Sequence, residues 1–313
     1  MNIIFFGTPE IAVPILSTVH THYNIKLLVC KPDKPQRRGQ KVIPCPTKKF
    51  ALMHNIPIIQ PFKLKNNKEI ITLMKDINPD FIIVVAYGLI LPTSILNIPN
   101  KAPINVHFSL LPKYRGAAPV NWAIINGEKY TGVTTMVMNS SLDGGDILLQ
   151  RSTIIDNKST PELCSELATL GSELIIKTIN NFSLIKRKKQ NDSKATYAPL
   201  IKKEDGLIDW SESAADIERK IRGLLDWPTA YSYLNGKLIK FYAAKVINKT
   251  PIDNYKPGEV VCVSKDSFCI ATGNGLLEIH KLQSEGKKIL NAAEFLRGNR
   301  IEKGTCFNTN RDF

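Results

Sequence analysis

The chain has 313 residues, of which 43% are hydrophobic and 22% are charged, as in folded globular domains and unlike disordered or fibrous chains. This length exceeds the usual size of one domain, so we expect two, each with its own core. The 42 Lys and Arg residues against 28 Asp and Glu give a formal net charge of +14. Such a charge favours a polyanionic partner such as RNA, although a compositional bias would raise it equally.

The first half of the chain alternates apolar strands with helices. Helices are predicted after the first strand and at residues 69–75, and the strands are predicted at residues 2–6, 25–29, 56–60 and 81–85. Apolar runs between helical segments are typical of parallel strands covered on both faces. We therefore predict an α/β fold with a doubly wound, Rossmann-like parallel sheet. Only Gly7 stands where a dinucleotide fold carries its glycines, and no Walker sequence occurs, which argues against a dehydrogenase or a kinase.

The composition changes near residue 186. Residues 186–203 are polar and rich in lysine, with Asp192 as their sole acid, which predicts a linker. A helix is predicted at residues 213–225, and Gly or Asn turns separate short strands at residues 230–234, 238–243, 260–263, 268–272 and 276–282. This spacing predicts a small OB-like β-barrel. The predicted organisation is an N-terminal domain at 1–186, a basic linker at 187–205 and a C-terminal barrel domain at 206–313.

The cysteines and the apolar segments bear on the location of the protein. The 6 cysteines are scattered, and no Cys or Cys/His group has metal-ligand spacing, so we expect no metal site. Residues 1–16 are apolar but lack the basic region and cleavage site of a signal peptide, and no run of about 18 apolar residues occurs. We therefore expect a cytoplasmic protein without a membrane segment.

The densest chemical signal lies in residues 104–119. Asn105 and His107 are two positions apart, so in a strand they face the same side. A histidine that exchanges a proton near neutral pH, beside an amide that donates to a developing oxyanion, suits acyl or formyl transfer to a nucleophile. Asp143, in a glycine-containing stretch, would orient His107 if its loop folds over the strand end. The alternative is a buried histidine with a purely structural role.

This segment resembles the folate-dependent formyltransferases, in which Asn, His, Ser and Leu-Pro recur at this spacing, with a later Asp on a glycine-containing loop. The similarity is strongest to the branch of the family that acts on methionyl-tRNA. It extends over nearly the whole chain, through residues 7–10, 84–92, 109–112, 115–119, 209–210, 217–219, 227–228 and 286–288. The resemblance implies transfer of the formyl group of 10-formyltetrahydrofolate to the α-amino group of methionyl-initiator-tRNA, with no metal.

The resemblance also implies roles for particular residues. Asn105, His107 and Asp143 form the implied catalytic set. The implied folate pocket is lined by Ser109, Leu110, Leu111, Pro112, Tyr87, Gly88, Leu89 and Ile90. Residues 138–142 lack the acidic residue and the glycine that are usual in the family, and this leaves the conformation of the loop open. Phe108 replaces a small residue and should point away from the reaction centre by strand alternation.

The acceptor is implied by a basic loop at residues 31–41, similar to the insertion through which the tRNA enzymes engage the acceptor stem. We predict that this loop selects the stem, chiefly through Arg38, and that loop and linker contact phosphates. The predicted tRNA contacts are Arg37, Arg38, Lys41, Lys188 and Lys189. A formyltransferase acting on a small amine is the alternative enzyme, and a stem-binding protein without catalysis is the non-enzyme alternative. We expect a monomer.

Overall fold

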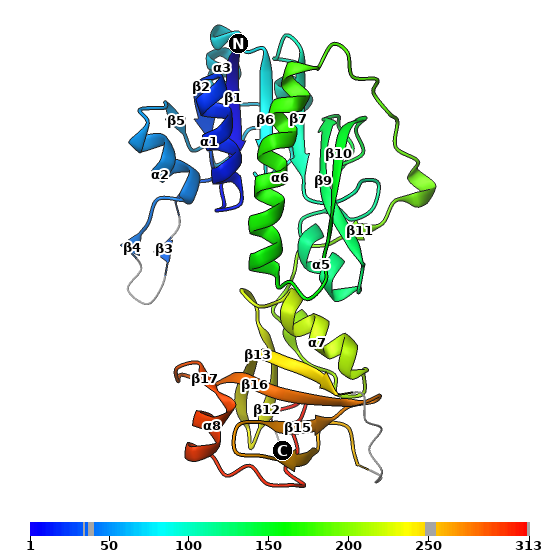
Figure 1. Ribbon diagram of the computed structural model, residues 1–313. Helices are drawn as coiled ribbons and strands as arrows, with labels where there is room; N and C mark the ends of the chain where they lie inside the picture. The colour runs from blue at the N-terminus through cyan, green and yellow to red at the C-terminus, as the bar shows by residue number, and fades with distance from the viewer. Residues whose placement is uncertain (34, 37–40, 248–254, 312–313) are drawn as a thin grey trace. The chain divides into compact units, whose positions relative to one another are not determined.

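The chain folds into two compact units, each assembled from separate stretches of sequence. The computed structural model describes residues 1–33, 35–36, 41–247 and 255–311, with the backbone alone at residues 35, 36, 41 and 42. The first unit comprises Met1–Pro119, Tyr130–Ile154 and Leu163–Pro199. The second comprises Val120–Lys129, Ile155–Glu162 and Leu200–Phe313 (Figure 1). The domain bounds of 1–186, 187–205 and 206–313 stay a prediction.

The first unit is built on a mixed sheet in the order β10-β9-β7-β6-β1-β2-β5. Its strands are β1 (Asn2–Gly7), β2 (Asn24–Val29), β5 (Ile58–Ile59), β6 (Phe81–Val85), β7 (Ala102–His107), β9 (Tyr130–Val137) and β10 (Ile147–Ile154). From β5 to β7 neighbouring strands are parallel, which confirms the predicted Rossmann-like sheet. Strand β9 runs antiparallel to β7, and β10 antiparallel to β9, so one edge is antiparallel.

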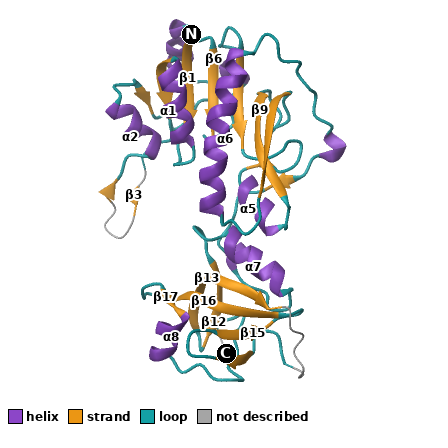
Figure 2. Ribbon diagram, viewed as in Figure 1, coloured by secondary structure: helices purple, strands orange, loops and turns teal. Residues whose placement is uncertain are grey.

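Helices cover both faces of this sheet (Figures 1 and 2). They are α1 (Ala12–His22), α2 (Pro46–Met53), α3 (Lys68–Ile77), α4 (Thr93–Leu96) and α6 (Thr160–Asn180). Helices α1 and α6 share one face, because a Cβ at Gly171 of α6 would lie 3.0 Å from Ile15 and 3.3 Å from Val106 of β7. Met74 of α3 and Ile95 of α4 belong to the core on the opposite face. The sheet is therefore doubly wound, as predicted.

The segment predicted as a linker pairs with the first unit. Lys188 exchanges two main-chain hydrogen bonds of 2.9 Å with Ile147. Further on, β11 (Tyr197–Ala198) lies parallel to β8 (Arg115–Gly116), after the short 3₁₀ helix η1 (Asp192–Lys194). Residues 188–198 thus run along the first unit. The basic loop contains a short antiparallel ladder of β3 (Pro35–Gln36) with β4 (Lys41–Val42).

The second unit is an antiparallel barrel with helices. Its elements are α5 (Pro119–Ile125), η2 (Glu204–Gly206), α7 (Ala214–Gly223), β12 (Ala230–Leu234), β13 (Lys237–Ile247), β14 (Val260–Val263), β15 (Phe268–Ala271), β16 (Leu276–Ser284), β17 (Leu290–Asn291) and α8 (Ala292–Gly298). The strand order is β12-β13-β16-β15-β14, with β17 beside β16. The C-terminal segment bridges the two ends of this order, because Asn308 pairs with Tyr233 of β12 and Cys306 pairs with Glu259 next to β14. This closure agrees with the predicted OB-like barrel.

Aromatic and aliphatic side chains fill the barrel. Trp210 packs edge-on against Phe241, and Phe268 stacks on Phe307. A disulfide joins Cys262 to Cys269, which face each other across β14 and β15. Within the described ranges, the helices include none that is long and apolar enough to cross a membrane.

Candidate active site

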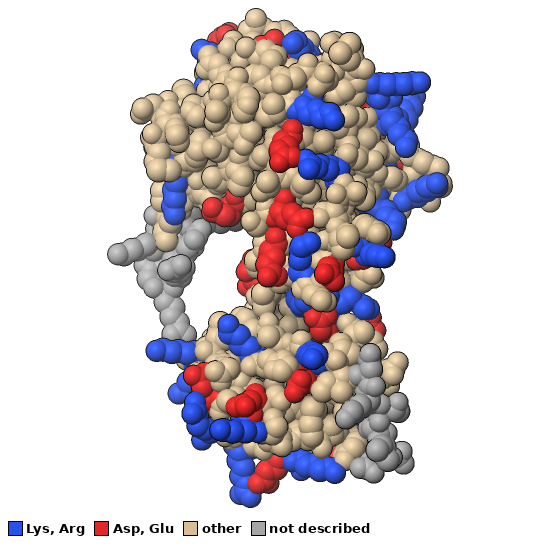
Figure 3. Space-filling view, viewed as in Figure 1, with Lys and Arg blue, Asp and Glu red and all other residues tan. Residues whose placement is uncertain are grey.

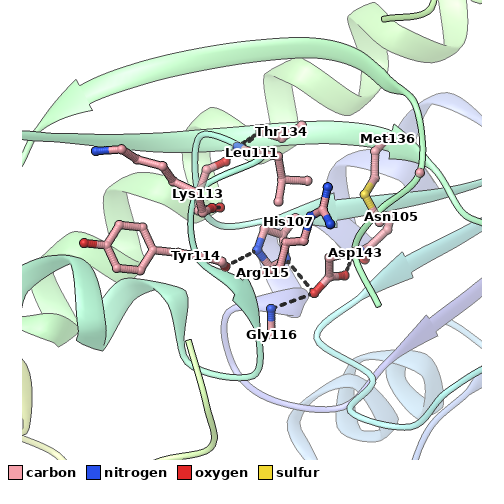
Figure 4. Close-up of polar contacts among 12 residues, drawn as sticks. Asn105, His107, Leu111, Lys113, Tyr114, Arg115, Gly116, Thr134, Met136 and Asp143 are labelled. Carbon is pink, nitrogen blue, oxygen red and sulfur yellow. Dashed lines mark hydrogen bonds and ion pairs between the residues drawn. The ribbon is translucent and has the colours of Figure 1, made fainter. Parts of the chain in front are cut away.

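Strand β7 positions the two polar side chains on which the predicted chemistry depends. All of its residues are buried, because it lies between β6 and β9. Asn105 is 8% exposed and His107 is 5% exposed, and strand alternation turns both to the same side of the sheet. Two buried polar groups in the interior of an apolar sheet require polar partners. Their partners come from two other parts of the first unit (Figure 4).

Asp143 reaches these side chains from the loop that joins β9 to β10. Its carboxylate Oδ1 accepts a hydrogen bond of 3.3 Å from Asn105 Nδ2, and its Oδ2 accepts one of 2.8 Å from Gly116 N. The backbone of Asp143 is left-handed, with φ of 47°, a conformation that residues other than glycine rarely adopt. At Gly145 a Cβ would lie 1.7 Å from Val137 O, so glycine is required for the loop to pass β9. The structure thus brings Asn105, His107 and Asp143 together.

The two ring nitrogens of His107 have different surroundings. Nε2 lies 2.8 Å from the carbonyl oxygen of Tyr114. Because a carbonyl only accepts hydrogen bonds, Nε2 is the protonated donor. Nδ1 lies 3.7 Å from Asp143 Oδ2, beyond hydrogen-bond length, and both side chains are mostly buried. Nδ1 is therefore the ring nitrogen that can take up a proton, and the imidazolium so formed would face a carboxylate.

The predicted folate residues Ser109, Leu110, Leu111 and Pro112 form a turn directly after β7. Thr134 of β9 donates to Ser109 O at 2.6 Å and accepts from Leu111 N at 3.2 Å. Gln150 donates to Leu111 O at 2.9 Å, and the peptide bond between Leu111 and Pro112 is cis. Neighbouring strands thus hold the backbone of this turn. Thr134 and Gln150 belong to no recognisable sequence motif, so the sequence analysis did not identify them.

The other predicted folate residues, Tyr87, Gly88, Leu89 and Ile90, follow β6. Tyr87 packs into the core edge-on against Phe6, and burial raises the pKa of its phenol to about 12. Among the described residues its buried hydroxyl has no hydrogen-bond partner. Leu89 and Ile90 are 44% and 80% exposed. This loop therefore turns one aromatic side chain inward and presents aliphatic side chains at the surface.

A hollow of ≈ 520 Å³ is lined by residues of α4, the first residues of β7, the last residue of β9 and the start of the loop that carries Asp143. Its lining residues are Thr93, Leu96, Asn97, Pro99, Lys101, Ala102, Pro103, Val137, Met138, Asn139 and Ser140. Pro103 is two positions before Asn105 on β7, so both face the same side of the sheet. Asn139 and Ser140 belong to the loop that carries Asp143. Sequence reasoning did not single out this hollow.

Two further polar residues, Arg115 and Gln190, form hydrogen bonds next to the cluster. Arg115 is buried, and its guanidinium donates to Gln190 Oε1 through Nε at 3.0 Å and Nη2 at 2.8 Å, and to Asp192 Oδ1 at 2.8 Å. Gln190 in turn donates to the loop that carries Asp143. Arg115 belongs to one of the sequence motifs that resemble the family. No sequence pattern pointed to Gln190, which stands among lysines in a segment with the composition of a linker.

The predicted tRNA-binding residues fall into two groups. Lys188 and Lys189 are exposed on the first unit. Arg37 and Arg38 lie outside the described residues, and of Lys41 only the backbone, in β4, is described. Figure 3 shows Lys and Arg side chains over the visible face of both units, including a group near α8 and β17. Within the described part of the chain, no group of His, Cys, Asp and Glu is placed to hold a metal ion.

The α/β sheet, the buried Asn, His and Asp, and the separate antiparallel barrel together define a two-domain group-transfer enzyme. Residues 1–179 match the family described as formyl transferase, and residues 200–300 match the formyl transferase C-terminal domain. The chain belongs to the formyl transferase family.

Relatives extend this match to nearly full length. The chain is 46% identical to the methionyl-tRNA formyltransferase of Clostridium tetani over 97% of its own length and 98% of the relative's. It is 44% identical to the enzyme of the same name from Geobacter metallireducens, with 97% of each chain covered. Among solved structures, the methionyl-tRNA formyltransferase of Clostridium thermocellum is similar with a TM-score of 0.57 at 20% identity, over 80% of this chain and 95% of that one. An N-formyltransferase of Helicobacter canadensis is similar with a TM-score of 0.65 at 20% identity, over 88% and 97%. Both likenesses concern the fold.

Proposed function

We propose that this chain transfers the formyl group of 10-formyltetrahydrofolate to the α-amino group of methionyl-initiator-tRNA. The observation that carries the proposal is the identity of 46% with a methionyl-tRNA formyltransferase over 97% of this chain and 98% of that one. A formyltransferase of small amines is less well supported, because the N-formyltransferase of Helicobacter canadensis, solved with folinic acid and dTDP-3-aminofucose, is 20% identical, against 46% for the methionyl-tRNA formyltransferase of Clostridium tetani. The Asn105, His107 and Asp143 cluster supplies the polar groups that such a transfer needs.

The reaction needs one proton to leave the attacking amine and one to reach the departing folate nitrogen. Nδ1 of His107 is the base in this proposal, since Nε2 already donates to Tyr114 O. When Nδ1 takes the proton, the positive ring faces Asp143 Oδ2 at 3.7 Å. Asp143 therefore stabilises the imidazolium and sets the orientation of the ring. The same nitrogen returns the proton to the folate nitrogen as the carbon–nitrogen bond breaks.

Attack on the formyl carbon creates a tetrahedral oxyanion, which needs a fixed donor. The Nδ2 group of Asn105 carries two hydrogens, and one of them points to Asp143 Oδ1 at 3.3 Å. The second is the proposed donor to the oxyanion. Because Asn105 is 8% exposed, water competes little for this hydrogen bond, and its stabilising effect is larger than at the surface.

The folate donor is proposed to bind in the ≈ 520 Å³ hollow and along the two predicted loops, residues 87–90 and 109–112. The hollow has the size of small-molecule sites, and its lining mixes apolar residues with polar ones that could hydrogen-bond a donor. The proposal is supported by two observations: Pro103, which lines the hollow, faces the same side of β7 as Asn105, and Asn139 and Ser140 belong to the loop that carries Asp143. The exposed Leu89 and Ile90 would pack against the aromatic part of the donor.

The tRNA is proposed to bind through basic side chains on both units. The net charge of +14 supports a sequence-independent attraction to phosphates. Lys188 and Lys189 are exposed on the first unit, and Lys287 and Lys288 are exposed next to β17. Arg37, Arg38 and Lys41 keep their proposed role in selecting the acceptor stem. The proposed location is the cytoplasm. The proposed active form is a monomer, which is supported by the origin of all three side chains of the cluster in one unit of one chain.

The test compares three acceptors. Purified protein is supplied with 10-formyltetrahydrofolate and, in turn, with charged initiator tRNA, charged elongator methionyl-tRNA and small amines such as glycinamide or an amino sugar. We expect rapid formylation of the initiator tRNA, slower formylation of the elongator and no detectable reaction with the small amines. Equal turnover of a small amine would overturn the assignment of the acceptor. Binding of tRNA without turnover would overturn the catalytic assignment.

A further inference from the structure

Residues 188–198 contact both flanks of the candidate active site. One flank is residues 114–116, which provide the carbonyl that meets His107 and the amide that meets Asp143. Thr196 holds this flank, since its Oγ1 accepts from Tyr114 N at 2.9 Å and its carbonyl accepts from Arg115 N at 2.8 Å. The other flank is the loop at residues 143–145. A segment with the composition of a solvated linker therefore borders the reaction centre on two sides.

Gln190 is the point where this segment meets both flanks. Its Nε2 donates to Asp143 O and to Gly145 O, each at 2.7 Å. Its Oε1 accepts from Nε and Nη2 of Arg115 at 3.0 Å and 2.8 Å. Both amide hydrogens and both acceptor positions of the side chain are thus used. Lys188 and Lys189 are exposed, whereas Gln190 is partly buried, as these contacts require.

The loop that Gln190 holds contains a left-handed residue. Asp143 has a φ of 47°, and such a left-handed backbone persists when the surrounding structure fixes it. The main-chain carbonyls on either side of Gly144 are the two groups that Gln190 binds. A small rotation of this loop would move the carboxylate away from His107 Nδ1, which is already 3.7 Å distant. Gly116 N and Asn105 Nδ2 hold the carboxylate of Asp143, and the Gln190 amide holds the main chain that carries it.

We infer that Gln190 is a positioning residue for formyl transfer, which holds the Asp143 loop and Arg115 in one arrangement so that the Asp143 carboxylate faces His107. This inference rests on the proposed function. Gln190 touches none of the reacting groups and acts through Asp143. Its loss should lower the rate of the chemical step and leave the binding of both substrates almost unchanged.

The experiment compares Gln190→Ala, Gln190→Glu and Asp192→Asn in the full-length protein by steady-state formylation of initiator methionyl-tRNA. Gln190→Ala should lower kcat about 10- to 100-fold, the usual effect of a displaced catalytic group, and change both KM values less than about threefold. In Gln190→Glu the side chain can still accept hydrogen bonds from Arg115, but a carboxylate oxygen that cannot donate then faces the carbonyl oxygens of Asp143 and Gly145. The kcat of this variant should therefore fall as much as that of Gln190→Ala. Asp192→Asn is the control, because Asp192 meets Arg115 from an exposed position and does not contact the loop. It should keep kcat within about twofold, because an exposed ion pair contributes little.

Thermal unfolding of each variant separates positioning from folding. Gln190→Glu should stay folded at the assay temperature, because its charge strengthens the bond to Arg115 and offsets part of the repulsion from the two carbonyls, and yet turn over slowly. Wild-type kcat in folded Gln190→Ala and Gln190→Glu would overturn the inference while leaving the proposed function intact. So would a loss confined to KM, which would give Gln190 a role in binding. A wild-type protein that does not formylate methionyl-tRNA would overturn the proposed function and this inference with it.

Discussion

Replacing Asp143 with Asn removes one negative charge and keeps the shape of the side chain. The amide oxygen can still accept from Gly116 N, as Oδ2 of the carboxylate does at 2.8 Å. The missing charge acts on His107, whose Nδ1 lies 3.7 Å from Oδ2, with side chains that are 6% and 13% exposed. For unit charges at this distance, with an effective dielectric constant of about 20, the attraction is about 4.5 kcal/mol. This attraction exists only when His107 is protonated, as during the transfer.

If the whole attraction acted in the transition state, its loss would slow turnover by roughly three orders of magnitude. The amide dipole of Asn replaces part of it, so we expect kcat of Asp143→Asn to fall by about 100- to 1,000-fold. The assay is single-turnover formylation at saturating donor and charged initiator tRNA, with folate affinity measured by fluorescence titration. Asp146→Asn, three residues further along the same loop, is the matched control and should retain the wild-type rate. A rate within threefold of wild type for Asp143→Asn would refute the role given to the carboxylate.

Three further outcomes are expected. Raising the salt concentration from about 50 to 200 mM should weaken tRNA binding at least tenfold and change the folate KM less than twofold, and equal sensitivity of the two would contradict a phosphate interface. Burial raises the pKa of Asp33, but hydrogen bonds from Lys48, Gln60 and Cys45 outweigh it and hold the pKa below the ordinary 3.8. A carboxyl group with a lowered pKa stabilises the fold at pH values above its pKa in the unfolded chain, and this stability is lost as the pH falls through its pKa in the folded protein. Asp33→Asn should therefore lower the free energy of unfolding at pH 7 and flatten the decline of that free energy below about pH 4, as measured by urea unfolding. Arg38→Lys should reduce the catalytic efficiency on initiator tRNA more than the affinity for tRNA, and near-wild-type efficiency on both initiator and elongator tRNA would end the claim that Arg38 reads the stem.

The pattern of apolar residues was sufficient to predict the elements whose stability is local. Strand β6 (Phe81–Val85) and strand β12 (Ala230–Leu234) lie at the residues that the apolar runs predict. Helix α7 (Ala214–Gly223) lies within the predicted helical stretch, and Ser213 caps it. In each case the period of the side chains along the chain matches the face that is buried. Such information is contained in a short window of sequence.

Elements that depend on distant partners were not predicted. The antiparallel edge formed by β9 and β10 and the long helix α6 (Thr160–Asn180) had no assignment. The closure of the barrel depends on Asn308 reaching Tyr233, far away in sequence. The disulfide between Cys262 and Cys269 follows from the register of two strands, which the spacing of the cysteines does not reveal. In each case the stabilising contact is made by residues that lie outside the short stretch of sequence from which an element can be predicted.

The sequence by itself was sufficient to identify the family of the enzyme and to propose the residue types of the reaction. Asn105 and His107 were predicted to share a strand face, because alternation along a strand is a local rule. Only the tertiary structure decided how these groups are oriented: that Nε2 of His107 is occupied by a carbonyl, that Nδ1 faces Asp143, and that Gln190 fixes the loop. The physical reason is that orientation depends on hydrogen bonds between residues far apart in the chain. From their composition, residues 186–203 were predicted to be a solvent-exposed basic linker. In the folded protein, part of this segment packs against the candidate active site.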